Sequence, residues 1–297
     1  MGAPGGVSEE AQVKQWQPTP LRRWCWVLTA TLVAFGSLGR AWQTQGGDQA
    51  VMMALVWGGA LCCVEDRLPR FRPRPSGVGL ALGVVLLLLA QWRQERIIQP
   101  MLTAQLLPMV QGLGLVCLAE PIGRWRIWRD PLLVLGLQPF SVIVGGLIPV
   151  GPLSRLTCRL GQVLFLSFGV DASVEGNQLI LPAGAVRVDG PCSGSGMVMQ
   201  LVMVAAIFSL LFPFGEGRRR WLAMGLAMGV APVFAVVANA MRIALLAMIH
   251  ASSWPQKNWW FEFFHSGDGG LVFALLAVMA FAPIYFRVQD HLMEPMP

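Results

Sequence analysis

Residues 195–213 read SGMVMQLVMVAAIFSLLFP, an apolar stretch without a charged residue. A helix rises about 1.5 Å per residue, so this stretch is long enough to cross a hydrocarbon layer of about 30 Å. Outward from it in both directions, further apolar blocks are bounded by charged residues or by proline and glycine clusters. The predicted spans are 24–43, 50–64, 77–92, 101–119, 131–150, 195–213, 221–249 and 270–287. The sequence therefore predicts an all-α polytopic membrane protein with about eight transmembrane helices.

The composition supports a membrane protein and excludes an ordinary soluble domain. Hydrophobic residues make up 55% of the chain and charged residues 13%, and the mean hydropathy is +0.58. The net charge of +6 does not indicate nucleic-acid binding, because the basic residues cluster in alternate connections between spans. These clusters lie before the first span, at 67–74, at 124–129 and at 218–220, and Arg287 follows the last span. By the positive-inside rule, both termini and the even-numbered connections are cytoplasmic.

The pattern divides the chain into four regions. They are a flexible cytoplasmic N-terminus at 1–19, N-terminal transmembrane helices at 20–130, a membrane core at 131–287 and a cytoplasmic tail at 288–297. The N-terminus does not resemble a cleaved signal peptide, so we expect the first span to remain as an anchor. No CxxC spacing or His/Cys cluster predicts a metal site, and we expect no cofactor.

The long connection at 151–194 is predicted to lie outside the cytoplasm. Apolar residues recur there at helical spacing, with polar residues between them, which favours a helix on the membrane surface. The apolar set is Leu153, Leu156, Leu160, Val163 and Leu164, and the polar set is Arg155, Arg159 and Gln162. Residues 177–189 then alternate in a β-like pattern that is broken at 182–184, which predicts a small hairpin. We therefore expect a helix-plus-hairpin insertion that shapes a binding site before the sixth span.

Cys192 lies in the sequence VDGPCSGSG at 188–196. Proline is favoured at the first position of a helix, which predicts that Cys192 lies in the first turn of the sixth span, at its outer end. The helix dipole would favour a thiolate there, and free N–H groups of Ser193 and Gly194 could donate to an oxyanion. The alternative is a small buried residue beside glycines that allow close helix packing.

Arg242 lies inside the seventh predicted span, about eight residues or roughly 12 Å from its outer end. A charged side chain at this depth is costly, so it should face the protein interior or a wet cavity and have a partner. Asn239 lies one turn earlier on the same face. The alternative is an arginine that extends to the lipid headgroups.

His265 follows an aromatic cluster at 259–264 that is typical of the membrane interface. An imidazole there could act as a general base and as an acid toward a leaving amine. It could also merely anchor the helix. His250 competes for the role, but it points about 80° away from Arg242 on a helical wheel, so His265 is preferred.

These motifs, in this order, resemble the exosortase/archaeosortase family of integral-membrane cysteine transpeptidases, most closely its cyanobacterial branch. The resemblance covers roughly 130–287. The family's Cys-Ser-Gly falls on Cys192, Ser193 and Gly194, its Asn-x-x-Arg on Asn239 and Arg242, and its later histidine on His265. Two residues depart from the family pattern. Pro191 stands where alanine is usual, and Ser195 stands where isoleucine or leucine is common.

The resemblance implies an enzyme of the inner membrane whose active site faces outward. Its partners would be exported proteins that end in a Pro-Glu-Pro type motif, one transmembrane helix and a basic tail. Cys192 would form a thioester with the substrate, Arg242 would stabilise the oxyanion and His265 would protonate the leaving amine. The acyl group would then pass to a lipid or a polysaccharide at the cell surface.

Two other classes remain open from the residues alone. One is a transporter or channel in which Arg242 binds an anion, although the repeats and paired broken helices common in transporters are not visible. The other is a membrane acyltransferase that acts on lipid through the histidine, for which Cys192 would be dispensable.

Overall fold

The computed structural model describes residues 20–65, 68, 71, 73–96, 101–215, 217–265 and 269–293. The predicted N-terminus at 1–19 and residues 294–297 of the predicted tail lie outside this part of the chain. A helix lies in each of the predicted spans, although the helix in the fifth span ends at Gly145, short of the predicted 150, and the helix in the sixth ends at Leu211, short of the predicted 213. These helices are α1 Pro20–Gln45, α2 Gly47–Glu65, α3 Gly77–Arg96, α4 Met101–Ala119, α5 Arg129–Gly145, α7 Ser195–Leu211, α8 Gly217–Ala251 and α10 Gly269–Met293. Helices satisfy their backbone groups internally, as the hydrocarbon environment requires.

Five described helices are long and apolar enough to cross a membrane by length and composition. Their apolar segments are Gly77–Gln94, Leu102–Ala119, Arg126–Gly145, Gly217–Ala251 and Gly269–His291. The apolar helices Gln49–Glu65 and Ser195–Leu211 are shorter. A predominantly helical, multi-pass membrane protein is therefore confirmed, while the count of eight spans stays a prediction.

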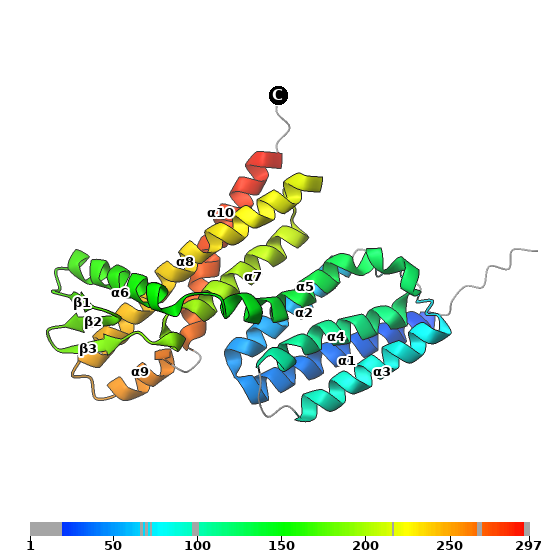
Figure 1. Cartoon of the computed structure of the whole chain (residues 1–297), viewed down its shortest axis with the longest axis horizontal. Helices are drawn as coiled ribbons and strands as arrows, with labels where there is room; N and C mark the ends of the chain where they lie inside the picture. Colours follow the sequence, from blue (N-terminus) through cyan, green and yellow to red (C-terminus); the bar gives the residue numbers. More distant parts are fainter. Residues whose placement is uncertain are drawn as a thin grey trace, which may run out of the picture.

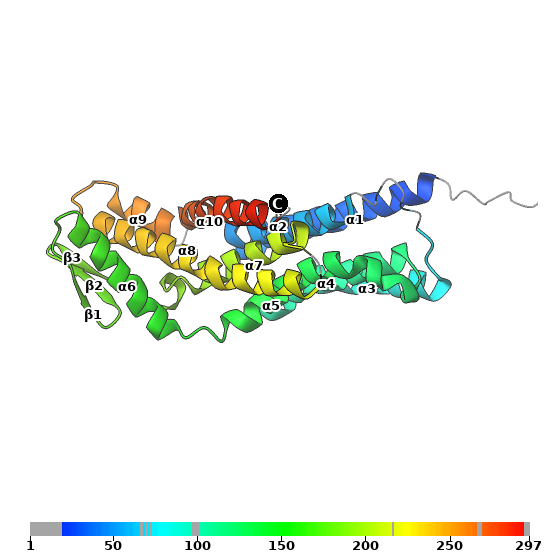
Figure 2. The ribbon, with the colours of Figure 1, turned by 90° about the horizontal axis from the view of Figure 1, so that it is seen from above.

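The molecule has two halves that lie one beyond the other along its long axis (Figures 1 and 2). Helices α1–α5 form the N-terminal half, and α6–α10 with a small sheet form the C-terminal half. A buried cluster that includes Val56 of α2, Val134 of α5 and Ala206 of α7 joins the two halves. A second cluster packs α7, α8 and α10 together, with Leu201, Ala235 and Phe281 among its members.

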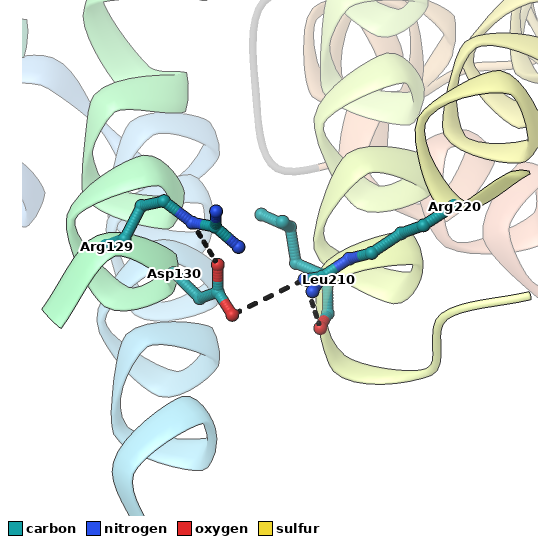
Figure 3. Close-up of polar contacts among 4 residues, drawn as sticks. All are labelled: Arg129, Asp130, Leu210 and Arg220. Atoms are coloured by element: carbon teal, nitrogen blue, oxygen red, sulfur yellow. Dashed lines mark hydrogen bonds and ion pairs between the residues drawn. The ribbon is translucent and has the colours of Figure 1, made fainter. Parts of the chain in front are cut away.

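A polar contact also ties the halves together (Figure 3). Arg220 Nη2 of α8 lies 3.4 Å from Asp130 Oδ2 of α5 and donates to the Leu210 carbonyl at 3.3 Å. Arg129 Nε lies 3.2 Å from the other Asp130 oxygen. Residues of two of the predicted cytoplasmic arginine clusters, at 124–129 and 218–220, are thus brought together.

The insertion between α5 and α7 lies at the end of the molecule where α9 also lies (Figure 1). It contains α6 (Val150–Ser167) and an antiparallel sheet in the order β1 (Ser173–Glu175), β2 (Gln178–Leu181) and β3 (Gly184–Arg187). β2 and β3 pair where the sequence alternates, with Leu179 opposite Val186. The sheet also has β1, which is three residues long and too short for an alternation pattern to reveal.

Helix α6 packs on the protein through small and polar residues and one phenylalanine rather than through its leucines. The buried residues are Ser154, Thr157, Cys158, Gly161 and Phe165. Leu156, Val163 and Leu166 remain 46%, 58% and 52% exposed. The face of α6 with the small and polar residues therefore packs against the rest of the protein. Its apolar face is exposed, as in an amphipathic helix at a membrane interface.

Candidate functional site

Cys192 ends a 3₁₀ turn, Gly190–Cys192, and α7 begins only at Ser195. The Cys192 N–H donates to the Asp189 carbonyl at 2.9 Å, and the Ser193 N–H donates to the Gly190 carbonyl at 3.2 Å. The prediction that Cys192 lies in the first turn of the span is therefore wrong, and so is the prediction of a free Ser193 N–H. The reason is Gly194, whose φ of +92° separates the turn from the helix.

Gly194 also allows α8 to approach the cysteine turn closely. A Cβ at this position would lie 2.6 Å from Asn239 Nδ2, well inside van der Waals contact. Both the left-handed backbone and the close approach require glycine here. Gly194 thus has a structural role that the sequence motif alone does not explain.

Asn239 and Thr157 hold the backbone of the cysteine turn. Asn239 is fully buried on α8, and its Nδ2 donates to the Cys192 carbonyl at 3.0 Å and lies 3.5 Å from Thr157 Oγ1. Thr157, fully buried on α6, donates from Oγ1 to the Ser193 carbonyl at 3.2 Å. Sequence reasoning missed Thr157 because the leucine stripe of α6 directed attention to the opposite face. Two helices that are distant in sequence therefore fix two successive carbonyls of the turn.

Arg242 lies one turn after Asn239 and is 9% exposed, so it faces the protein interior as predicted. Its Nε donates to the Phe264 carbonyl at 2.8 Å, and its Nη2 donates to the His265 carbonyl. These carbonyls end α9 (Lys257–His265), a helix that the sequence did not predict. The last carbonyls of a helix lack partners within it and carry partial negative charge, so a guanidinium is well placed there. The alternative of an arginine extended to the headgroups is wrong.

The charge environment of Cys192 does not produce an easily ionised thiol. Burial raises the pKa of the Cys192 thiol above its ordinary value. The positive charge of Arg242 opposes this shift and lowers the pKa, while Asp189 raises it further. The helix-dipole expectation of a favoured thiolate is thus outweighed by desolvation, and the thiol would need a base to take its proton.

The rings of the two candidate histidines both pack on one aromatic ring, that of Phe261. His265 is exposed at the end of α9, and its ring stacks on Phe261 with centroids 5.3 Å apart. The His250 ring packs on the same Phe261 at 5.9 Å and lies against Gly184 of β3. Phe261 in turn packs against the buried cluster that contains Cys192. The structure thus brings Cys192, Asn239 and Arg242 together and anchors His265 through its backbone.

The described residues contain no group of three or more His, Cys, Asp or Glu side chains that could hold a metal ion. The chemistry that the arrangement itself offers is that of a buried thiol, a buried cation within electrostatic reach of it and imidazoles at the edge of the same cluster. Such a set suits nucleophilic attack on an acyl carbon followed by proton transfer.

A family model described as transmembrane exosortase (Exosortase_EpsH) matches residues 42–282. The match extends from the last turn of α1 into α10 and includes every residue of the site described above. It also reaches further toward the N-terminus than the resemblance over 130–287. No curated protein and no solved structure matched the chain.

Proposed function

This chain belongs to the transmembrane exosortase family, and from that premise we propose that it is a membrane cysteine transpeptidase that processes exported proteins. Its substrates would carry a C-terminal Pro-Glu-Pro type motif, a transmembrane helix and a basic tail. The enzyme would reside in the inner membrane, with the end that carries α6, the sheet and α9 facing outward.

One observation carries the proposal: a single turn of α8 binds both loops that bear the proposed reactive residues. Asn239 bonds the carbonyl of Cys192, and Arg242 bonds the carbonyls of Phe264 and His265. Residues 192 and 265 are far apart in sequence, and this double attachment ties the turn that bears Cys192 and the end of α9 that bears His265 to the same turn of α8. Positioning of this kind lowers the entropic barrier to reaction.

In the proposed mechanism, Cys192 Sγ attacks the scissile carbonyl carbon near the sorting motif, and its proton passes to His265. The carbonyl oxygen becomes an oxyanion that the Arg242 guanidinium stabilises. The C–N bond then breaks, the amine leaves with the proton from His265, and the thioester remains. A nucleophile from the surface acceptor attacks the thioester, forms the new acyl bond and releases the thiol. The raised pKa of the thiol is the reason that a base is required.

The direct test replaces Cys192 by alanine and follows a co-expressed protein that carries the sorting tail. Cys158→Ala is a matched control, because Cys158 is fully buried in the same cluster and burial raises its thiol pKa to about 11. We expect processing to be lost in Cys192→Ala at unchanged membrane levels and kept in Cys158→Ala. Normal processing by Cys192→Ala would contradict the proposal and favour a lipid acyltransferase or a transporter.

The histidines provide a second matched pair, since both rings pack on Phe261. We expect His265→Ala to abolish processing and His250→Ala to reduce it only slightly. The reverse result would transfer the acid-base role to His250 while leaving the cysteine mechanism in place.

A further inference from the structure

The strand that leads into the cysteine turn forms one edge of the small sheet. β3 is last in the order β1-β2-β3, so β2 is its one neighbour in the described sheet. Only residues 188 and 189 separate β3 from the turn that carries Cys192. Val186 of β3 is buried in the same cluster as Cys192, whereas Ala185 and Arg187 are exposed. An exposed strand edge therefore lies directly before the proposed nucleophile.

The register shows which backbone groups of β3 face this edge. The Val188 N–H, just past the strand, donates to the Asn177 carbonyl at 2.8 Å. In an antiparallel pair, every second residue bonds the neighbouring strand, so Val186 also directs its N–H and C=O to β2. Ala185 and Arg187 direct theirs away from β2, and no partner of these groups occurs among the described residues. Such a row of open groups can pair with another strand.

The direction of β3 matches the chain direction of the substrate in the proposed function, on which this inference rests. β3 runs into the cysteine turn and then into α7, which begins at Ser195 (Figure 1). A substrate whose exported part precedes its transmembrane helix also runs from the outer surface into the membrane. If an extended segment lies parallel to β3, the peptide bonds that follow it pass toward Cys192. If the segment is antiparallel, they lead away from it.

We propose that the segment of the exported protein just before its transmembrane helix binds as a fourth strand, parallel to β3, through the backbone groups of Ala185 and Arg187. Backbone hydrogen bonds to a sheet edge are a general mode of peptide recognition. Only every second residue of the added strand bonds β3. Prolines at alternate positions, as in a Pro-Glu-Pro type motif, fit this pairing because their missing N–H groups point away from the edge.

Disulfide trapping tests the pairing without relying on catalysis. The full-length enzyme carries Cys192→Ala and Ala185→Cys, and sorting-tail substrates carry single cysteines at successive positions before the transmembrane helix. Side chains of adjacent strands face each other at every second residue, within reach of a disulfide. We therefore expect cross-links at alternate substrate positions, all before the cleavage site of the wild-type product. Val174→Cys, on β1 at the opposite edge of the sheet, is the matched control and should give no alternating pattern.

A proline variant tests the contribution of the backbone group to processing. Ala185→Pro removes an N–H without a partner among the described residues, and proline is tolerated where a strand N–H points outward from an edge. We expect an unfolding midpoint near that of the wild type and a kcat/KM that is roughly tenfold lower, as for the loss of one hydrogen bond. Val174→Pro, at the opposite edge, should keep the wild-type kcat/KM. If Ala185→Pro does not fold, the cross-linking pattern decides.

Cross-links at no position, at every position or only beyond the cleavage site would overturn the proposal. A wild-type kcat/KM in folded Ala185→Pro, or an equal loss in Val174→Pro, would also overturn it. If Cys192→Ala still abolishes processing, any of these results removes the strand pairing and leaves the cysteine mechanism in place. Normal processing by Cys192→Ala would instead overturn the proposed function and, with it, the pairing that rests on it.

Discussion

The two halves of the molecule use their buried polar side chains differently. In the N-terminal half, glutamines bond one another across helices, as when Gln111 accepts from Ser37 at 2.7 Å and donates to Gln94 at 3.3 Å. In the C-terminal half, Thr157, Asn239 and Arg242 bond backbone carbonyls of the connections. The first arrangement fixes helices against helices, and the second fixes the loops that carry reactive groups.

If this difference reflects function, changes in the C-terminal half should affect processing and changes in the N-terminal half should affect stability. Apart from Cys192 and His265 themselves, the largest effect is expected for Arg242→Lys. A lysine ammonium is a point charge without the planar fork whose Nε and Nη2 bond the two adjacent carbonyls, so we expect a loss of processing of roughly 100- to 1,000-fold. Turnover of the sorting-tail substrate measures it, and Arg287→Lys, at an exposed site on α10, is the control. Wild-type turnover by Arg242→Lys would contradict the idea that the buried polar residues of the C-terminal half serve processing.

Gly194→Ala should have the next largest effect, because it tests the loop attachment without removing a polar group. The new methyl group would meet Asn239, and the positive φ would be strained, at a cost of about 1–3 kcal/mol. We expect a lower thermal unfolding midpoint and impaired processing. Gly196→Ala, two residues away, meets no atom within 4 Å and should be neutral or slightly stabilising. Equal unfolding midpoints and equal processing in the two variants would show that the cysteine turn can shift to accommodate a methyl group at position 194.

The charges around Cys192 predict opposite shifts in its reactivity. Alkylation of the Cys192 peptide, followed by mass spectrometry, should accelerate as pH rises toward the raised thiol pKa. Arg242→Gln removes the charge that lowers this pKa, so the midpoint should move to higher pH. Asp189→Asn removes a charge that raises it, so the midpoint should move to lower pH. Shifts in the same direction in both variants would contradict the charge assignment.

The smallest effect is expected for Gln111→Leu in the N-terminal half. It removes the partner of Ser37 and Gln94, so we expect about 0.5–2 kcal/mol of destabilisation with processing unchanged. Gln43→Leu, at an exposed position of α1, should change neither the stability nor the processing. A loss of processing in Gln111→Leu, beyond what its stability explains, would mean that the glutamine network reaches the cysteine site.

Much of the fold follows from local sequence properties. Hydropathy and helix length placed helices on the predicted spans, because a helix in hydrocarbon depends mainly on its own residues. Short elements were harder to predict. β1 and α9 have three and nine residues, too few for a period to stand out from the aromatic and loop residues around them.

For the candidate site, the sequence indicated which residues to consider but not how they are arranged. Cys192, Asn239 and Arg242 were found by motif and by the cost of a charge at depth, and the structure brings them together. The motif could not reveal Thr157, because a threonine in an amphipathic helix carries no signal until its buried face is known. It also placed Cys192 one structural element too late, because the left-handed backbone of Gly194 is a property of the packed loop.

By itself, therefore, the sequence determined that this is a multi-pass helical membrane protein of the exosortase family, and it identified the polar residues that such a chain would otherwise exclude. Tertiary structure alone decided that α8 holds the cysteine turn and the end of α9 at once, and that Thr157 of α6 faces the same turn. The physical reason is the separation along the chain of the residues that interact. Hydropathy and helix formation depend on neighbouring residues, whereas the bond from Asn239 to the Cys192 carbonyl joins residues 47 positions apart and exists only when the helices pack.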